Sequence, residues 1–309
     1  MRIVVAGGTG FLGRPLVEWL GGEGHDVLAL SRQAPPAPGV GQVWTDAPGV
    51  RAAAWTGSEN LAGWGHVVDG AHAVVNLAGE SIAARRWSDE HKARMRASRL
   101  EATRAIGRAI AAAAQPPAVL VNSSATGYYG SRGDTRLVEQ SAPGDDFLAR
   151  LCVEWEQAAR EAGGPATRVV VVRTGVVLER DGGALAKMLL PFRLFAGGPM
   201  GTGGQYMSWI HRRDWIALVA WLLRGGEDGP FNATAPEPVT NAEFSRALGQ
   251  ALGRPSWLPA PAFALKTLLG EMADALLLSG QRVIPQRALE GGFNFAFPTL
   301  DLALADILG

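Results

Sequence analysis

The sequence has little to stabilise it covalently and no excess of charge. Cys152 is the only cysteine among 309 residues, so no internal disulfide can form, which is typical of a reducing compartment. The 29 basic and 29 acidic side chains cancel, and this balance favours neither nucleic acid nor an anionic membrane surface as a partner. The longest apolar run, residues 215–223, is too short to cross a bilayer. These absences predict a cytoplasmic protein whose partner is a small molecule.

Two kinds of reactive site are also missing from the pattern. The five histidines lack the spacing of metal ligands, so we expect no metal. No histidine lies near Cys152 in the sequence to act as its base. We therefore expect Cys152 to be a small buried hydrophobic residue and not a nucleophile.

A glycine-rich turn near the N-terminus is the most informative feature that is present. Residues 3–6 have the composition of a buried parallel strand, and the string G-G-T-G-F-L-G follows directly. We expect Gly7 to permit a tight turn, Gly10 to let the backbone approach a pyrophosphate, and Gly13 to let a helix pack on the strand. That helix, over residues 11–20, would present its free N–H groups to phosphates.

The end of the second predicted strand indicates which dinucleotide is bound. Residues 26–30 follow the helix at the distance expected for such a fold, and the strand ends in Ser31 and Arg32. An NAD site usually places an acidic residue here to accept from the ribose 2′-OH, whereas a hydroxyl and a guanidinium suit a 2′-phosphate. We therefore predict NADP as the cofactor, with further contacts from three residues of the glycine turn, Thr9, Phe11 and Leu12.

Strands and helices alternate over the first 180 residues. Further strands are predicted at residues 50–55, 73–77, 118–122 and 168–173, helices at 88–114 and 146–162, and a Pro- and Gly-rich loop at 33–49. This alternation predicts an α/β fold with a doubly wound parallel sheet of the Rossmann type. We expect an NADP-binding domain over residues 1–180 and a smaller, mostly helical, substrate-facing domain over 181–309. The C-terminal module of the smaller domain would begin near residue 250.

Segments of the second half also carry expectations. The glycine-rich residues 197–209 predict a flexible lid over the substrate, with a fixed glycine turn as the alternative. Residues 262–278 are apolar at helical spacing and are expected in the core or at an interface. Asp214 is expected to cap a helix that starts at Trp215.

Many short strings together resemble one family. They include G-G-T-G-F-L-G, N-L-A-G-E from Asn76, R-R-W from Arg85, G-Y-Y from Gly127, R-T-G-V-V-L from Arg173, L-L-P-F-R-L from Leu189, S-W-I-H from Ser208, N-A-T-A-P from Asn232, T-N-A-E-F from Thr240 and V-I-P-Q-R from Val283. The sequence is similar to the epimerase/dehydratase-like, atypical short-chain dehydrogenases that end in a short domain of unknown function. Such proteins are often labelled nucleoside-diphosphate-sugar epimerases or cell-division inhibitors.

The resemblance implies further cofactor residues. Leu77 and Ala78 would run along the adenosine and diphosphate, Arg99 would reach the cofactor from the long helix, and Val177 would lie near the nicotinamide. Arg99 and Arg32 offer bidentate donors for phosphate oxygens, although a solvated charge on a helix is the simpler reading of Arg99. The adjacent Gly79 and Ser123 complete the predicted cofactor site.

The chemistry expected from the family is only partly present. Ser124 fits the Ser or Thr that polarises a carbonyl after the fifth strand, but the Tyr-x-x-x-Lys pair that delivers the proton is absent. Leu148 and Cys152, or Cys152 and Glu156, occupy its two positions. Tyr128 and Tyr129 are candidate general acids, with aromatic packing as the alternative for each.

Gln205, Trp209 and His211 are the candidate residues on the substrate side. His211, together with Asp214, could orient substrate or shuttle a proton. The alternative is that His211 is a strand residue whose hydrogen bonds are satisfied within the protein. The sequence thus predicts an NADP-dependent oxidoreductase or epimerase acting on a small polar substrate such as a nucleotide sugar. The competing hypothesis is a non-catalytic NADPH-binding sensor that has lost its proton donor. Either form is compatible with a homodimer.

Overall fold

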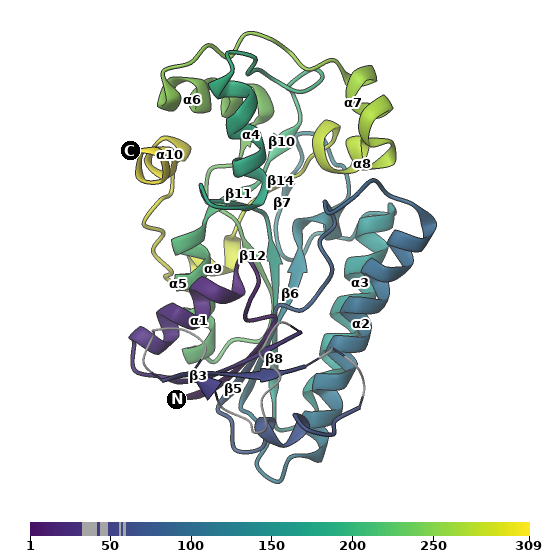
Figure 1. The fold of residues 1–309 in the computed structure, drawn as a ribbon, viewed down its shortest axis with the longest axis vertical. Helices are drawn as coiled ribbons and strands as arrows, with labels where there is room; N and C mark the ends of the chain where they lie inside the picture. The colour runs from purple at the N-terminus through teal and green to yellow at the C-terminus, as the bar shows by residue number, and fades with distance from the viewer. Residues whose placement is uncertain (33–41, 44–48, 56, 58–59) are drawn as a thin grey trace.

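A computed structural model of the chain describes residues 1–32, 42–43, 49–55, 57 and 60–309 (Figure 1). The loop predicted at residues 33–49 lies for the most part outside these residues. Its described part includes β3 (Gln42–Val43), which pairs antiparallel with β4 (Val50–Ala54). No helix among the described residues is long and apolar enough to cross a membrane.

The centre of the molecule is an open, twisted sheet. Seven of its eight strands are parallel and lie in the order β12-β8-β6-β5-β1-β2-β4, with β3 at the edge. Their bounds are β1 Arg2–Ala6, β2 Asp26–Ser31, β5 Ala73–Asn76, β6 Val119–Ala125, β8 Arg168–Thr174 and β12 Gly229–Ala233. The strand order reverses between β1 and β5, and such a reversal leaves a crevice at the carboxyl ends of the two strands.

Helices cover both faces of the sheet, as predicted for a doubly wound fold. Helices α1 (Gly13–Gly22) and α5 (Arg212–Arg224) pack on one face, and α2 (Asp89–Ala112) and α3 (Phe147–Gly163) cover the other (Figure 1). Strands β1, β2, β5, β6 and β8 are buried on both sides and consist largely of Val, Leu, Ile and Ala. Ser88 caps α2 by accepting from the backbone N–H of His91 at 3.2 Å.

The second half of the chain forms a smaller, mostly helical layer above the carboxyl edge of the sheet (Figure 1). Its helices are α4 Gly183–Arg193, α6 Asn241–Leu252, α7 Ala262–Leu269, α8 Glu271–Ala273, α9 Gln286–Glu290 and α10 Leu300–Leu308. Short strand pairs join them, formed by β7 (Arg136–Leu137) with β14 (Arg282–Val283), β9 (Val176–Leu178) with β11 (Trp209–His211), and β10 (Tyr206–Met207) with β13 (Val239–Thr240). Two elements of this half belong to the main sheet layer. Strand β12 is the edge strand beside β8, and helix α5 packs on one face of the sheet.

The predicted helix at residues 262–278 is interrupted. Gly270 adopts a left-handed φ of 63° that ends α7, and a π-helical turn at Asp274–Leu278 follows α8. The predicted start of α5 was also wrong, because α5 begins at Arg212 and is capped by His211, whose Nδ1 accepts from the Arg213 N–H at 3.0 Å. Asp214 lies in the first turn and accepts instead from the backbone N–H groups of Ala296 and Phe297 at 2.9 Å each.

Candidate functional site

The glycine turn after β1 is shaped by steric limits. Gly7 has φ 77°, and a Cβ on it would lie 2.9 Å from the Leu77 carbonyl carbon. A Cβ on Gly13 would lie 2.2 Å from the Gly7 oxygen, so only glycine lets α1 start this close to the strand. A Cβ on Gly10 would meet only the Gly7 oxygen, at 3.3 Å, which leaves open space above this glycine.

Helix α1 starts without a capping side chain. Leu12 is its N-cap and makes no side-chain hydrogen bond there, and the first turn contains no acidic residue. The N-terminal N–H groups of a helix carry the positive end of its dipole and need acceptors. The ring of Phe11 lies against the turn at Gly182 and Gly183, and this turn covers one side of the start of α1. The start of α1 is therefore built to receive an anion.

The turn is tied to the end of β2. Thr9 Oγ1 and Ser31 Oγ are 2.6 Å apart, and this contact holds the glycine turn beside the strand end. Arg32 follows directly and its side chain is exposed. A hydroxyl, a guanidinium and the helix start therefore lie at one edge of the sheet, as the sequence predicted.

The carboxyl end of β5 forms the opposite wall of the crevice. Asn76 is fully buried and its amide donates to Asn122 Oδ1 at 2.7 Å and to Thr103 Oγ1 at 3.0 Å. Its own Oδ1 accepts from the Ala78 N–H at 3.1 Å, which fixes the course of the chain through Leu77 to the exposed Gly79. Leu77 and Ala78 are both partly exposed.

Arg99 reaches this wall from α2. Its side chain passes over Gly79, where a Cβ would lie 3.2 Å from the Arg99 Cγ, and its guanidinium lies 5.1 Å from the ring centre of Trp155. The guanidinium donates to the Met95 carbonyl at 2.9 Å but has no carboxylate partner within 4.0 Å among the described residues. Burial lowers its pKa. Arg99 is partly buried, and the Glu80 charge offsets the effect of burial only in part, so this position favours an anionic ligand.

Ser124 lies at the base of the crevice, at the carboxyl end of β6. It is only 4% exposed, and its hydroxyl donates to Glu156 Oε1 at 2.8 Å. Glu156 also forms a bidentate ion pair with Arg173, with both N–O distances at 2.8 Å. The carboxylate and guanidinium are both buried, and burial is tolerated because each is hydrogen-bonded and paired. Ser123, one residue earlier, pairs with Val172 in β8 and is partly exposed.

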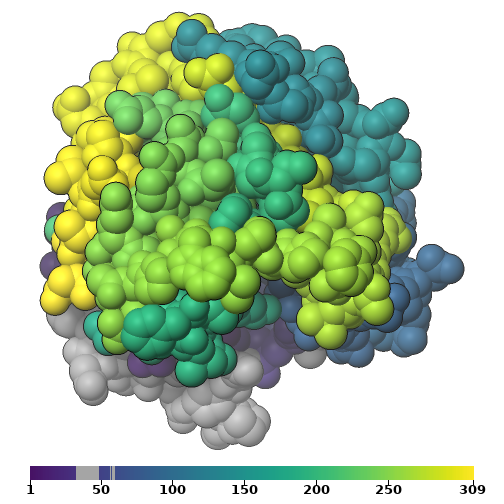
Figure 2. Space-filling view, turned by 90° about the horizontal axis from the view of Figure 1, so that it is seen from above, coloured from purple at the N-terminus to yellow at the C-terminus, as the bar shows by residue number. Residues whose placement is uncertain are grey.

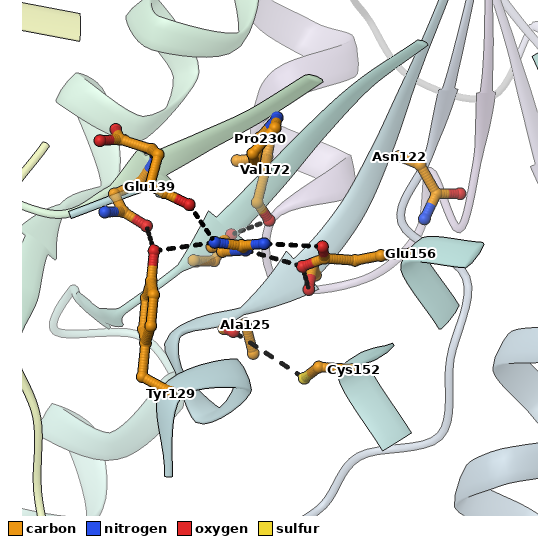
Figure 3. Close-up of polar contacts among 12 residues, drawn as sticks. Asn122, Ala125, Tyr129, Glu139, Cys152, Glu156, Val172 and Pro230 are labelled. Carbon is orange, nitrogen blue, oxygen red and sulfur yellow. Dashed lines mark hydrogen bonds and ion pairs between the residues drawn. The ribbon is translucent and has the colours of Figure 1, made fainter. Parts of the chain in front are cut away.

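Arg173 connects this pair to the second half of the chain (Figure 3). Its Nη1 donates to Tyr129 Oη at 3.0 Å and to the Glu139 carbonyl at 2.9 Å. The Tyr129 hydroxyl donates in turn to Asn232 Oδ1 at 2.6 Å. Burial raises the pKa of Tyr129 to about 12, even though Arg173 acts in the opposite direction.

The two candidate tyrosines have different surroundings. Tyr129 is fully buried and its hydroxyl has two partners, as in the packing alternative. Tyr128 is partly exposed, its ring lies 3.5 Å from the Arg173 guanidinium carbon, and its hydroxyl makes no hydrogen bond within the described part of the chain. Of the two, only Tyr128 has a hydroxyl available to an incoming group.

Cys152 lies one helical turn before Glu156 on α3. Its thiol is buried 3.8 Å from the Ala125 carbonyl oxygen. Burial and the nearby Glu156 charge raise the pKa of the thiol to about 11, which keeps it protonated at neutral pH. Leu148 lies a further turn toward the helix start, where its Cβ would be 3.3 Å from a Cβ on Gly127.

The residues selected for the substrate side make structural contacts. The Gln205 amide donates to the carbonyls of Met200 (3.0 Å) and Leu277 (2.7 Å), and Trp209 is fully buried in the core of the smaller layer. His211, besides capping α5, stacks on Phe297 with ring centres 3.9 Å apart. Val177 is buried in β9. Their assignment to substrate or cofactor stays a prediction.

The glycine-rich segment 197–209 is held along its length. Met200 N donates to Asn241 Oδ1 at 2.7 Å, Gly201 N donates to the Ala260 carbonyl at 2.9 Å, and Gly203 N donates to the Met200 carbonyl at 3.0 Å. The segment then enters β10 and β11. These contacts fit the fixed glycine turn better than the flexible lid, because every glycine of the segment except the exposed Gly204 lies close against other parts of the chain.

Sequence reasoning missed most of the buried network. The sequence pattern indicates Glu156 only as the residue at an absent catalytic position, and Arg173 and Asn232 only as members of family strings. Glu139 was not considered, yet its buried carboxylate accepts from the backbone N–H groups of Asn232 (3.0 Å) and Arg287 (3.3 Å). One signal was available, since an arginine that follows four valines in a predicted buried strand must find a buried partner.

The sheet order, the glycine turn and the uncapped helix start define a Rossmann-type nucleotide-binding protein. The sequence pattern of the NAD dependent epimerase/dehydratase family matches residues 3–233, and that of a domain of unknown function (DUF1731) matches residues 260–307. The chain belongs to the NAD dependent epimerase/dehydratase family, as its sequence motifs indicated.

Relatives match over the full length. The epimerase family protein SDR39U1 of Bos taurus is 42% identical over all of both chains. A crystal structure of the human epimerase family protein SDR39U1 (isoform 2) with NADPH has a TM-score of 0.88 and 40% identity, covering 100% of this chain and 99% of that one. A nucleoside-diphosphate sugar epimerase from Corynebacterium glutamicum has a TM-score of 0.77 and 32% identity, covering 100% of this chain and 58% of that one.

Proposed function

We propose that this chain binds NADP(H) and is an oxidoreductase that acts on a small polar substrate. The observation that carries the proposal is Arg99, a desolvated guanidinium at the carboxyl edge of the sheet with no carboxylate partner among the described residues. The uncapped start of α1 would receive an anion in the same way. The human relative that was crystallised with NADPH supports the same ligand.

NADP is favoured over NAD by the end of β2. Arg32 and Ser31 would hold the 2′-phosphate, while the open space above Gly10 and the wall from Leu77 to Gly79 would accommodate the diphosphate. Thr9 and Ser31 position one another through their 2.6 Å contact. When bound, NADPH would supply a hydride.

The proton would come from the protein. Tyr128 is the candidate donor, because its hydroxyl is not engaged by the described residues, whereas that of Tyr129 holds Asn232 and Arg173. Ser124 would polarise the substrate carbonyl after exchanging its hydrogen bond to Glu156 for one to substrate. Nucleotide sugars are the first substrate class to test, as the Corynebacterium relative suggests. A cytoplasmic location and a homodimer are part of the same proposal.

The binding proposal is tested by titrating NADPH and NADH against tryptophan fluorescence. We expect the unmodified chain to prefer NADPH, and Arg32→Ala to lose about 1.5–3 kcal/mol of NADPH affinity, roughly 10- to 100-fold, with little change for NADH. Arg96→Ala is the matched control, because Arg96 is an exposed arginine of α2 that pairs with Glu154. Equal or tighter binding of NADH by the unmodified chain contradicts the proposal.

A second function, NADPH sensing without turnover, is favoured by one observation. Ser124 and Tyr129 are already hydrogen-bonded within the buried network, Ser124 to Glu156 and Tyr129 to Arg173, and the family's Tyr-x-x-x-Lys positions hold no tyrosine or lysine. A screen of NADPH oxidation against nucleotide sugars, aldehydes and ketones distinguishes the two. Turnover that Tyr128→Phe abolishes and Cys152→Ser leaves unchanged identifies an enzyme. Tight NADPH binding without turnover across the panel identifies a sensor.

A further inference from the structure

One segment beside the crevice lacks the packing that holds the rest of the sheet edge. Residues 80–88, which we call the strap, run from the crevice wall at Gly79 to Ser88, the cap of α2. None of the strap residues is buried, and none belongs to a helix or a strand. A segment with few buried contacts and no regular backbone hydrogen bonds opens at a low cost in free energy.

The two ends of the strap are fixed to the first half of the chain. At one end, the Glu80 N–H donates to Ser98 Oγ of α2 at 3.0 Å. At the other end, the Trp87 indole donates to the Ile82 carbonyl at 2.8 Å, and its ring packs on Phe147 of α3 with ring centres 5.5 Å apart. The ends are therefore anchored, and the residues between them form a loop that depends on other contacts.

The second half of the chain supplies those contacts. Lys187 of α4 donates to the Ala83 carbonyl at 3.2 Å. The Arg86 guanidinium lies against Gly270, where a Cβ would be 2.8 Å from the Arg86 Nε. Gly270 has a left-handed φ of 63°, so both its backbone and this close contact require glycine. Figure 2 shows the chain of this region, in blue, beside the lime-green α7 and α8.

The residue after Gly270 strengthens the same attachment. Glu271, the first residue of α8, forms an ion pair with Lys92 in the first turn of α2, directly after the strap. Arg86 forms no hydrogen bond or ion pair with any residue that the structure describes, so it is held on Gly270 by packing alone. Two adjacent residues of the C-terminal module therefore hold the strap and the start of α2.

These contacts can break without unfolding the chain. Lys187 and Arg86 are exposed, and the Glu271 side chain is 53% exposed, so each contact contributes little stability. Helix α7, which precedes Gly270, has no buried residue. The prediction that residues 262–278 lie in the core is therefore wrong for α7, and the part of the module that holds the strap is itself at the surface.

The position of the strap relates it to the crevice. The strap continues directly from the wall at Leu77 to Gly79, and the Arg99 side chain lies on Gly79. The sequence predicted a lid at residues 197–209, but that segment is hydrogen-bonded along its length, whereas the middle of the strap has one hydrogen bond to the second half of the chain.

We propose that the strap is a lid over the crevice and that the C-terminal module is the latch that holds this lid closed. A latched lid slows the entry and the exit of a ligand alike, and it leaves the affinity unchanged when the ligand does not contact the lid. The lid rests on the proposed function only in that NADP(H) is taken as the ligand of the crevice. The latch is a property of the chain without ligand.

Limited digestion with trypsin tests the latch, because the strap contains Arg85 and Arg86. The cleavage rate follows the open population of a segment when opening is fast relative to cleavage. Glu271→Gln and Lys187→Met should each raise the rate of cleavage after these two arginines, followed by mass spectrometry, about 2- to 5-fold. The double variant should combine the two factors, on the order of 10-fold.

Two controls separate opening of the strap from general loss of structure. Glu154→Gln is the matched variant, because it breaks the exposed ion pair of Arg96, another cation of α2, and it should leave the cleavage rate unchanged. Cleavage after the buried Arg173 reports global unfolding in the same digest and should not change in any variant. Equal cleavage rates in the unmodified chain and the double variant overturn the latch.

Stopped-flow fluorescence with NADPH tests the lid. In the double variant the association and dissociation rate constants should rise by the same factor, with the Kd unchanged. A changed Kd with an unchanged association rate overturns the lid, since the strap would then be a binding element and not a barrier. A chain that binds no NADPH contradicts the proposed function, and the cleavage rates then decide whether the latch exists.

Discussion

The two halves of the crevice differ in how well their polar groups are satisfied. On the cofactor side, the start of α1 has no capping side chain, and Arg99 has no carboxylate partner among the described residues. On the side of β6 and β8, Ser124, Glu156, Arg173, Tyr129 and Asn232 form a continuous buried chain of hydrogen bonds. The first half is built around groups that a ligand must complete, and the second is complete without one.

This difference separates binding from chemistry. A site with unsatisfied donors gains free energy when an anion arrives, whereas a satisfied network must give up a hydrogen bond before it can act on a substrate. Cofactor binding therefore depends on residues that contribute little to folding. The buried network is, by contrast, part of the structure that holds β6, β8 and α3 together.

The largest loss of stability is expected from breaking the buried network around Arg173. Arg173→Met leaves the buried Glu156 carboxylate with only the exposed Arg160 guanidinium, 3.9 Å away, as an ion-pair partner, and we expect a loss of about 3–5 kcal/mol in the free energy of unfolding, measured in urea. The double variant Arg173→Met with Glu156→Leu should recover much of this loss, because no unpaired charge remains. Arg96→Met breaks an exposed pair and should cost less than about 1 kcal/mol. Equal losses of unfolding free energy for the buried and the exposed ion pair would contradict the difference between the two halves of the crevice.

The buried thiol gives the next largest effect. Because burial raises the pKa of Cys152 from 9.0 to about 11, its thiolate fraction at pH 8 should be on the order of 100-fold lower in the folded chain than in the unfolded one. Labelling with a thiol reagent at pH 8 should therefore be slow, and it should become fast in urea. Cys152→Ser supplies the background rate. Rapid labelling of the folded chain would show that the Cys152 thiol is accessible and would contradict its place in the buried network.

The smallest effect concerns pH. Burial lowers the pKa of His211 below its usual 6.5, so the folded chain binds fewer protons at this site than the unfolded chain, and Asp306 opposes this only in part. The contribution of His211 is therefore complete above pH 6.5 and is lost as the pH falls below 6.5. We expect about 1 kcal/mol, because protonation of Nδ1 also removes the cap of α5. His211→Asn retains a capping side chain and should flatten the stability profile between pH 7.5 and 5.

Local patterns predicted the sheet well. Strands β1, β2, β5, β6 and β8 are runs of Val, Leu, Ile and Ala with glycine or proline nearby, and their buried environment follows from that composition alone. Strand β12 was missed because G-P-F-N-A is short and begins with glycine and proline, which usually indicate a turn. Its place at the sheet edge comes from pairing with β8, a contact with residues about 60 positions earlier.

The sequence was informative about those parts of the candidate site whose residues lie close together in the chain. The glycine turn and Ser31-Arg32 lie within the first 32 residues, so spacing alone was informative. The network around Arg173 joins residues 17 to 103 positions apart, and no spacing rule relates Ser124 to Glu156 or Tyr129 to Asn232. The sequence predicted Asp214 as the cap of α5, whereas His211 is the cap in the structure. Both residue types accept hydrogen bonds, and only the backbone decides which one precedes the helix.

The C-terminal module is attached largely through main-chain atoms. The Ile284 carbonyl accepts from Asn232, the Arg287 N–H reaches Glu139, and the N–H groups of Ala296 and Phe297 reach Asp214. During synthesis these partners emerge last, after every strand of the main sheet. The interior around Asn232 and Glu139 therefore stays incomplete until nearly the whole chain has left the ribosome, and a chain that stops before residue 284 has a finished main sheet but lacks the main-chain groups that bond Asn232 and Glu139.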